Sequence, residues 1–118
     1  YLRSKLTHDP PEFTSIFCVA WTGALAAMRA LRELGWRVPE DVSLVTYAGE
    51  SLLPSYLNPP LTAIQADMST YADRVIEQLE RQFEDPRAEP QRLRIVPELQ
   101  VRESTTRLRS ATARKGQS

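Results

Sequence analysis

A strand–helix–strand pattern in the first half of the chain constrains its fold more than any other feature. Residues 14–20 form a short apolar run without alternation, which is typical of a strand buried on both faces of a parallel sheet. In residues 22–34 apolar side chains recur every three or four positions, as on one face of a helix, with Thr22 as the expected N-cap and Gly35 just beyond the helix end. Residues 42–47 form a second apolar run. Strand, helix and strand at this spacing predict a right-handed βαβ unit.

The middle of the chain predicts one more strand and one more helix. A proline-containing loop at residues 48–60 leads to a third apolar run at residues 61–66. The helix is expected over residues 69–84, with Asp67 or Ser69 as its N-cap, because apolar positions again follow a helical period there. Its expected apolar face consists of Ala72, Val75, Ile76, Leu79 and Phe83.

The last part of the chain predicts a pair of short strands and a tail. Residues 93–97 and 99–101 are β-prone, with an interruption at Pro97, because proline lacks the amide hydrogen that a sheet ladder needs. Residues 1–13 form a polar N-terminal segment. Residues 107–118 form a basic tail without an apolar period, which is expected to be a disordered, solvated terminus, with a DNA-contacting arm as the alternative.

Composition excludes several classes of protein and site. Fifteen basic and fifteen acidic side chains cancel, so the net charge indicates neither a nucleic acid nor a membrane partner. Cys18 and His8 are the only residues of their kinds, which excludes an intrachain disulfide and a metal site built from cysteine and histidine. The apolar stretch at residues 16–28 is shorter than the roughly 20 residues of a membrane-spanning helix, and no signal peptide is expected. A cytoplasmic protein without a metal or cofactor is the prediction.

Catalysis is not predicted. Ser51 follows Gly49 and Glu50, but residue 53 is leucine, so the Gly-x-Ser-x-Gly nucleophile motif is not met. The four glycines do not form a phosphate-binding loop. His8 lies in the polar N-terminal segment, where a general base held in a dry site is not expected.

Four stretches of the chain resemble phrases typical of the LacI/GalR family of bacterial transcription regulators. They lie in order over residues 13–106 and read IFC followed by ALAAMRAL, then GWRVPEDVSLV, PPLTAI and VPELQVREST. The resemblance implies an α/β fold, a three-layer parallel-sheet subdomain of the type I periplasmic-binding-protein-like fold, present here as a fragment. Residues 14–106 would be the C-terminal part of the effector-binding and dimerisation domain. The DNA-binding headpiece, through which the family binds operator DNA, is expected to lie outside this chain.

The resemblance also implies a ligand site with altered chemistry. In the family, the loop after the first of these strands usually reads Asn-Asp, and the loop after the second reads Gly-Tyr/Phe-Asp-Asp. Here the first pair is Ala20-Trp21, and Glu50 is the first acid after the second strand. We therefore expect Trp21 to stack on a sugar ring or an aromatic effector and Glu50 to accept a hydrogen bond. The alternatives are a packing role for Trp21 and a regulator that senses no small molecule. The ligand-binding positions carried over are Ala20, Trp21, Tyr47, Ala48, Glu50 and Gln65.

A homodimer is the second implied property. The carried-over dimer positions are Leu25, Met28, Arg29, Arg32, Leu52, Leu53, Tyr56 and Leu57. The large apolar side chains of the 48–60 loop need a cover, and folding of that loop onto its own domain is the alternative to dimerisation. The apolar stripe of the 69–84 helix predicts self-association in addition, if only these residues are present. A periplasmic sugar-binding protein of a transport system, which shares the fold, is the alternative function.

Overall fold

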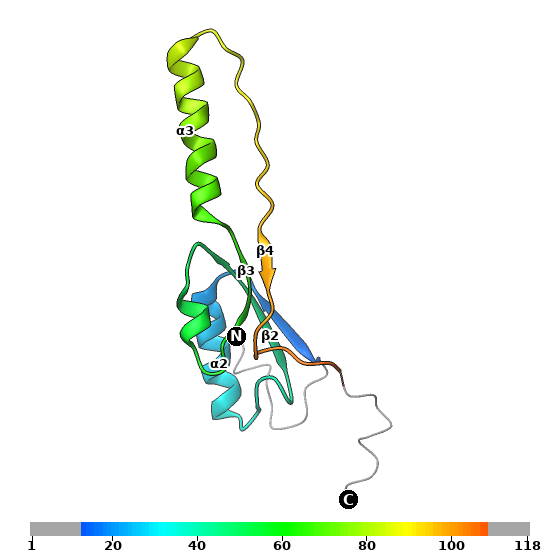
Figure 1. Cartoon of the computed structure of the whole chain (residues 1–118). Coiled ribbons are helices and arrows are strands. Elements are labelled where there is room, and N and C mark those ends of the chain that lie inside the picture. The colour runs from blue at the N-terminus through cyan, green and yellow to red at the C-terminus, as the bar shows by residue number, and fades with distance from the viewer. Residues whose placement is uncertain (1–12, 109–118) are drawn as a thin grey trace, which may run out of the picture.

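The computed structural model describes residues 13–108, which form a small sheet from which a helical arm projects (Figure 1). The sheet has four strands in the order β1-β2-β3-β4, and these are Ser15–Cys18, Ser43–Gly49, Thr62–Gln65 and Glu98–Gln100. Strands β1, β2 and β3 are parallel to one another, and β4 is antiparallel to β3. The predicted α/β class with a mainly parallel sheet is confirmed. Most of the predicted N-terminal segment and basic tail lies outside the described residues.

Helix α2, Trp21–Glu33, connects β1 to β2 and packs on one face of the sheet. The prediction that Thr22 is the N-cap is wrong. The helix begins at Trp21, and Ala20 occupies the N-cap without a side-chain hydrogen bond. The predicted helix end is confirmed. Gly35 follows the C-cap Leu34 with φ of +77°, a left-handed conformation that glycine adopts without strain.

The core lies between α2 and the sheet. Leu31, Leu44 and Leu61 are each 0% exposed, and burial of one such side chain stabilises the fold by about 1.5–3 kcal/mol relative to exposure. The two clusters of buried apolar residues are Ala24, Ala27, Met28, Leu44 and Leu61, and next to them Leu31 and Val42. The predicted apolar face of the first helix is therefore the face that holds it to the sheet.

Among residues 13–108, little covers the opposite face of the sheet. Helix α2 is the one helix of residues 13–108 with extensive contacts to the sheet, so these residues supply two of the three expected layers. The prediction that β1 is buried on both faces is wrong, since Phe17 is 57% exposed. The reason is positional: β1 lies at the sheet edge, and its side chains on the face away from α2 have no covering helix within the described part of the chain.

An arm projects from the sheet where β3 ends (Figure 1). It consists of helix α3, Met68–Glu84, and an extended return segment, residues 85–97. Asp67 is the N-cap and accepts hydrogen bonds from the amides of Ser69 and Thr70, which confirms one of the two predicted caps. The strand predicted at residues 93–97 is wrong, because this stretch runs beside the helix instead of a partner strand, and β4 begins only at Glu98.

Candidate functional site

The carboxyl ends of the three parallel strands meet at one edge of the sheet, which we call the carboxyl edge (residues 19–21, 48–51 and 65–66). Cys18 lies opposite Thr46 in the ladder, and Gly49 lies opposite Gln65. The amide of Ala66 donates to the carbonyl of Gly49 at 2.9 Å, which closes the ladder at this end. Ligands of parallel α/β sheets bind at this edge because the connecting loops leave room there. Five of the six predicted ligand positions lie at this edge, and the sixth, Tyr47, lies within β2 just before it.

Trp21 and Glu50 are the predicted ligand-binding side chains of the carboxyl edge. Trp21 is the first residue of α2 and half-buried, and Glu50 is exposed directly after β2. An indole offers a flat apolar surface, and a carboxylate offers acceptors to hydroxyl or N–H donors. Tyr47 is 42% exposed, and it lies on the sheet face opposite to α2 because side chains alternate along β2. Together these groups suit a ligand with a ring and hydrogen-bond donors.

Ala20 and Ala48, the two alanines among the predicted ligand positions, have small side chains that carry no hydrogen-bonding group. Ala48 is 6% exposed and faces the core side of the sheet. Ala20 is the N-cap of α2, and its carbonyl accepts the first helical hydrogen bond from the amide of Ala24 at 3.2 Å.

Gln65 is already held by two hydrogen bonds within the chain. Its Nε2 donates to the carbonyl of Ser51 at 2.8 Å, and its Oε1 accepts from Nη2 of Arg102 at 2.6 Å. The side chain therefore joins the end of β3 to the loop after β2 and to the residue that follows β4 and Val101. This arrangement makes Gln65 a part of the frame of the carboxyl edge.

The predicted dimer positions fall into two groups. Met28 is 8% exposed and Leu57 packs against the same core, so these two face their own domain. The remaining members are exposed on α2 or around the short 3₁₀ helix Leu53–Tyr56. Tyr56 is 79% exposed, whereas Pro54 in the same turn is buried and its carbonyl accepts from the amide of Leu61 at 2.8 Å. The loop is thus anchored from beneath and presents Leu52, Leu53 and Tyr56 outward.

A buried polar cluster at the start of β3 was not predicted as functional. Ser104 is 0% exposed, and its Oγ accepts from the Thr62 amide and donates to the carbonyl of Leu44. The Thr62 hydroxyl contacts that of Thr105 at 2.8 Å. The only sequence signal was the Arg-x-Ser-Thr phrase at residues 102–105, which the resemblance used without assigning it a role.

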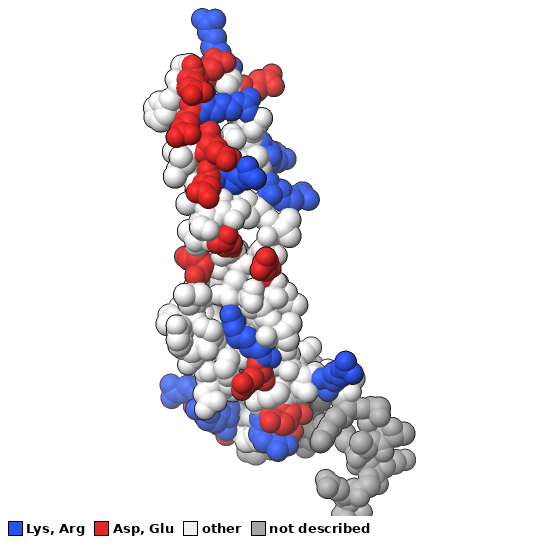
Figure 2. All heavy atoms as spheres, viewed as in Figure 1, with Lys and Arg blue, Asp and Glu red and all other residues white. Residues whose placement is uncertain are grey.

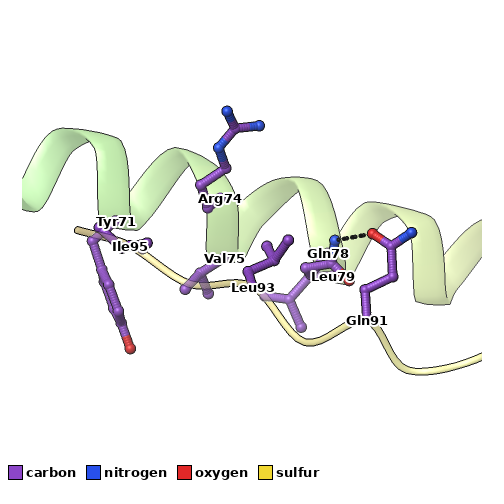
Figure 3. A pocket seen from close by; sticks show the side chains of 8 residues that line it. All are labelled: Tyr71, Arg74, Val75, Gln78, Leu79, Gln91, Leu93 and Ile95. Atoms are coloured by element: carbon purple, nitrogen blue, oxygen red, sulfur yellow. Dashed lines mark hydrogen bonds between the residues drawn. The ribbon is translucent and has the colours of Figure 1, made fainter.

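The arm carries an open groove of about 300 Å³ between α3 and the return segment (Figure 3). Apolar side chains from both sides line it, and Gln78 Nε2 donates to Gln91 Oε1 across one end at 3.2 Å. Its apolar lining consists of Tyr71, Val75, Leu79, Leu93 and Ile95. Acidic side chains gather along one edge of the arm and basic side chains along the other (Figure 2). This groove was not predicted, and it belongs to the arm instead of the carboxyl edge.

Two titratable groups near these elements have shifted pKa values. Hydrogen bonds from the side chains of Thr70 and Ser69 lower the pKa of Asp67. Desolvation raises the pKa of Cys18, consistent with a small packed side chain instead of a reactive thiolate. Within residues 13–108 no cluster of histidine, cysteine, aspartate and glutamate has the composition of a metal site. No helix in that range combines the length and apolar character needed to cross a bilayer.

Residues 2–105 match the family model described as a periplasmic binding protein-like domain. The chain belongs to this family. Among curated relatives, the HTH-type transcriptional repressor PurR of Vibrio vulnificus is 33% identical over 95 residues, which is 80% of this chain and 28% of the relative. The HTH-type transcriptional regulator CelR of Thermobifida fusca is 33% identical over 100 residues, 85% of this chain and 29% of the relative.

Solved structures agree with these relatives. A transcriptional regulator CelR–cellobiose complex has a TM-score of 0.69 at 32% identity and covers 80% of this chain and 28% of that one. A LacI family transcriptional regulator from Bifidobacterium animalis subsp. lactis has a TM-score of 0.69 at 28% identity, with 87% of this chain and 37% of that one covered. The chain is thus a LacI/GalR-type effector-binding domain segment that spans less than a third of the curated relatives described above. These relatives favour a regulator over a periplasmic transport receptor.

Proposed function

We propose that this chain is the ligand-sensing and dimerisation part of a LacI/GalR-type DNA-binding transcription regulator and performs no catalysis. The observation that carries the proposal is the carboxyl edge. There the parallel strands end together, and Trp21 and Glu50 follow the ends of two of them. Operator DNA would be bound by a headpiece outside this chain. A cytoplasmic location and the absence of a cofactor belong to the same proposal.

The proposed effector is a ring-shaped molecule with hydrogen-bond donors, and a carbohydrate is the leading class. A stacked indole and a single exposed carboxylate match the apolar face and the hydroxyl groups of a sugar. The solved structure of a transcriptional regulator CelR that is similar to this chain is a complex with cellobiose. Gln65 would contribute less directly to binding of the effector, because its side-chain amide is already hydrogen-bonded to Ser51 and Arg102.

The proposed dimer surface combines exposed positions of α2 with the loop around Leu53–Tyr56. Leu52, Leu53 and Tyr56 are 63%, 52% and 79% exposed, although each is a large apolar side chain. Such a cluster is typical of the apolar centre of a protein interface, and Arg29 and Arg32 on α2 would form part of its polar rim. Met28 and Leu57 support this surface from beneath.

The experiment that tests the function is isothermal titration of the longest gene product that carries this sequence. The panel contains cellobiose, ribose, sugar phosphates, nucleosides and aromatic acids. We expect one sugar-like compound to bind at one site per chain and to change the affinity for operator DNA. Intact operator binding with no heat from any compound would contradict the ligand-sensing part of the proposal and favour a regulator without an effector.

A further inference from the structure

We propose that Arg102 is a positioning residue of the carboxyl edge, which acts through Gln65 and fixes the loop that carries Glu50. The proposal rests on the function proposed above, because it concerns the same edge. No role was expected for Arg102 from its place in the sequence. Its contacts, however, reach from the start of β3 to the loop after β2 through one intermediate side chain.

The guanidinium of Arg102 lies along β3. Its Nη1 donates to the carbonyl of Leu61 at 2.7 Å, just before the strand, and its Nη2 donates to Oε1 of Gln65 at 2.6 Å, at the last residue of the strand. Its backbone amide donates to the Thr62 hydroxyl at 2.9 Å. The half-buried side chain is therefore held at its base and at both terminal nitrogens, and a planar fork of this kind loses little freedom for each bond formed.

This contact determines the orientation of the Gln65 amide. A guanidinium has N–H donors and no acceptor, so it can bind only the oxygen end of the amide. With Oε1 directed to Arg102, Nε2 is directed to the carbonyl of Ser51 at 2.8 Å. The opposite orientation would place Nε2 against a cation and Oε1 against a carbonyl oxygen, and both contacts would be repulsive. Arg102 thus selects the one orientation in which Gln65 binds the loop.

Ser51 is the point at which that loop is tethered. Its amide donates to the carbonyl of Ala48 at 3.0 Å, and its Oγ accepts from the amide of Leu53 at 3.3 Å. Glu50 lies directly before it and has an exposed side chain. The bond from Gln65 therefore holds the backbone that follows Glu50, which restricts the positions that its carboxylate can reach.

The test is hydrogen exchange measured by NMR on the full 118-residue chain. In Arg102→Lys, a single ammonium replaces the fork and cannot hold Leu61 and Gln65 together. We expect the amides of Ser51, Leu53 and Ser55 to exchange about tenfold faster, as the loss of a charge-assisted hydrogen bond allows. Helix α2 amides should exchange at the wild-type rate. Gln65→Met, which keeps the side-chain length and removes both bonds, should have the same local effect.

Arg94→Lys is the matched control, because Arg94 is an exposed arginine of the return segment. Unchanged loop amides in either Arg102→Lys or Gln65→Met would overturn the proposal. Equal acceleration in the loop and in α2 would also overturn it, because Arg102 would then support the whole fold and not the loop. Neither readout needs an effector, so a failure of the ligand-sensing function in the titration panel remains separable from a failure here.

Discussion

The Oγ atom of Ser104 accepts a hydrogen bond from the Thr62 amide at 2.7 Å, across 42 positions of the sequence. The same oxygen donates to the Leu44 carbonyl, and the Ser104 carbonyl accepts from the Leu44 amide at 2.8 Å. Pro59 and Pro60 precede β3 and have no amide hydrogen, so the ladder between β2 and β3 cannot extend through them. Ser104 completes the pairing there and thereby fastens the last part of the chain to the first βαβ unit.

Ser104→Ala is predicted to destabilise the chain. The substitution leaves the Thr62 amide and the Leu44 carbonyl without this partner in a buried site, which costs about 1–3 kcal/mol of the free energy of unfolding. Urea unfolding followed by circular dichroism measures the change. Thr22→Ala is the control, because its exposed hydroxyl does not cap α2, and it should alter the free energy by less than about 0.5 kcal/mol. Equal midpoints for Ser104→Ala and wild type would contradict the assignment.

The N-cap of α3 is predicted to weaken in acid. The pKa of Asp67 is lowered from 3.8, chiefly by hydrogen bonds from the side chains of Thr70 and Ser69. A lowered pKa in the folded state means that the cap contributes fully above the unfolded pKa and is lost as pH falls through the folded pKa. NMR shifts of the Ser69 and Thr70 amides should therefore titrate below pH 3.8. Asp67→Asn keeps an acceptor at the N-cap and should abolish this titration, and a midpoint above the ordinary value would contradict the account.

The sequence pattern predicted the three parallel strands and α2, because short apolar runs lie on either side of a segment with a clear helical period. The apolar face from Ala24 to Leu31 is the face that packs on β2. The errors arose where local pattern and tertiary contact differ. Thr22 is a good cap by residue type, yet α2 begins at Trp21. Residues 93–97 are β-prone, yet they run beside α3 because the return segment has no strand to pair with.

The exposed stripe of α3 is predicted to drive self-association of the 118-residue chain. No residue of α3 is buried, and Ile76 and Phe83 are 52% and 83% exposed. Sedimentation velocity over a concentration series should show dimers or larger species. Ile76→Asp and Phe83→Asp should each shift the distribution toward monomer, since burial of the stripe would then desolvate a charge.

Gln100→Glu is the control for those two variants. It adds one negative charge at an exposed position of β4, outside the arm. It should leave the association unchanged. A monomeric wild-type chain at every concentration, or equal effects of the three substitutions, would contradict a role for the stripe.

The loop around Leu53–Tyr56 is predicted to form part of a dimer interface in the longest gene product that carries this sequence. Leu52→Ser combined with Tyr56→Ser should raise the dimer dissociation constant at least tenfold, because truncation of the few central anchors of an interface costs about 2 kcal/mol or more. Analytical ultracentrifugation measures the constant. The thermal unfolding midpoint should change little, as both side chains are exposed. An unaltered constant would indicate that the loop serves its own domain.

The ligand positions Trp21, Glu50 and Gln65 were predicted from the family resemblance, and their role as a site stays a prediction. The structure shows that the parallel strands bring these residues to one edge of the sheet. The bonds of Gln65 to Ser51 and Arg102 join segments far apart in the sequence, and no local pattern encodes them. Met28 was predicted both on the apolar face of the first helix and at the dimer surface, and its burial agrees with the first of these predictions.

The most direct measurement of the central claim is calorimetric titration of the compound that binds in the panel, using matched variants. Trp21→Ala should abolish binding, and Glu50→Gln should weaken it about tenfold through the loss of a charged acceptor. Glu40→Gln, at an exposed position in the loop before β2, is the control and should bind as wild type does. Wild-type affinity in both Trp21→Ala and Glu50→Gln would contradict the carboxyl edge as the effector site.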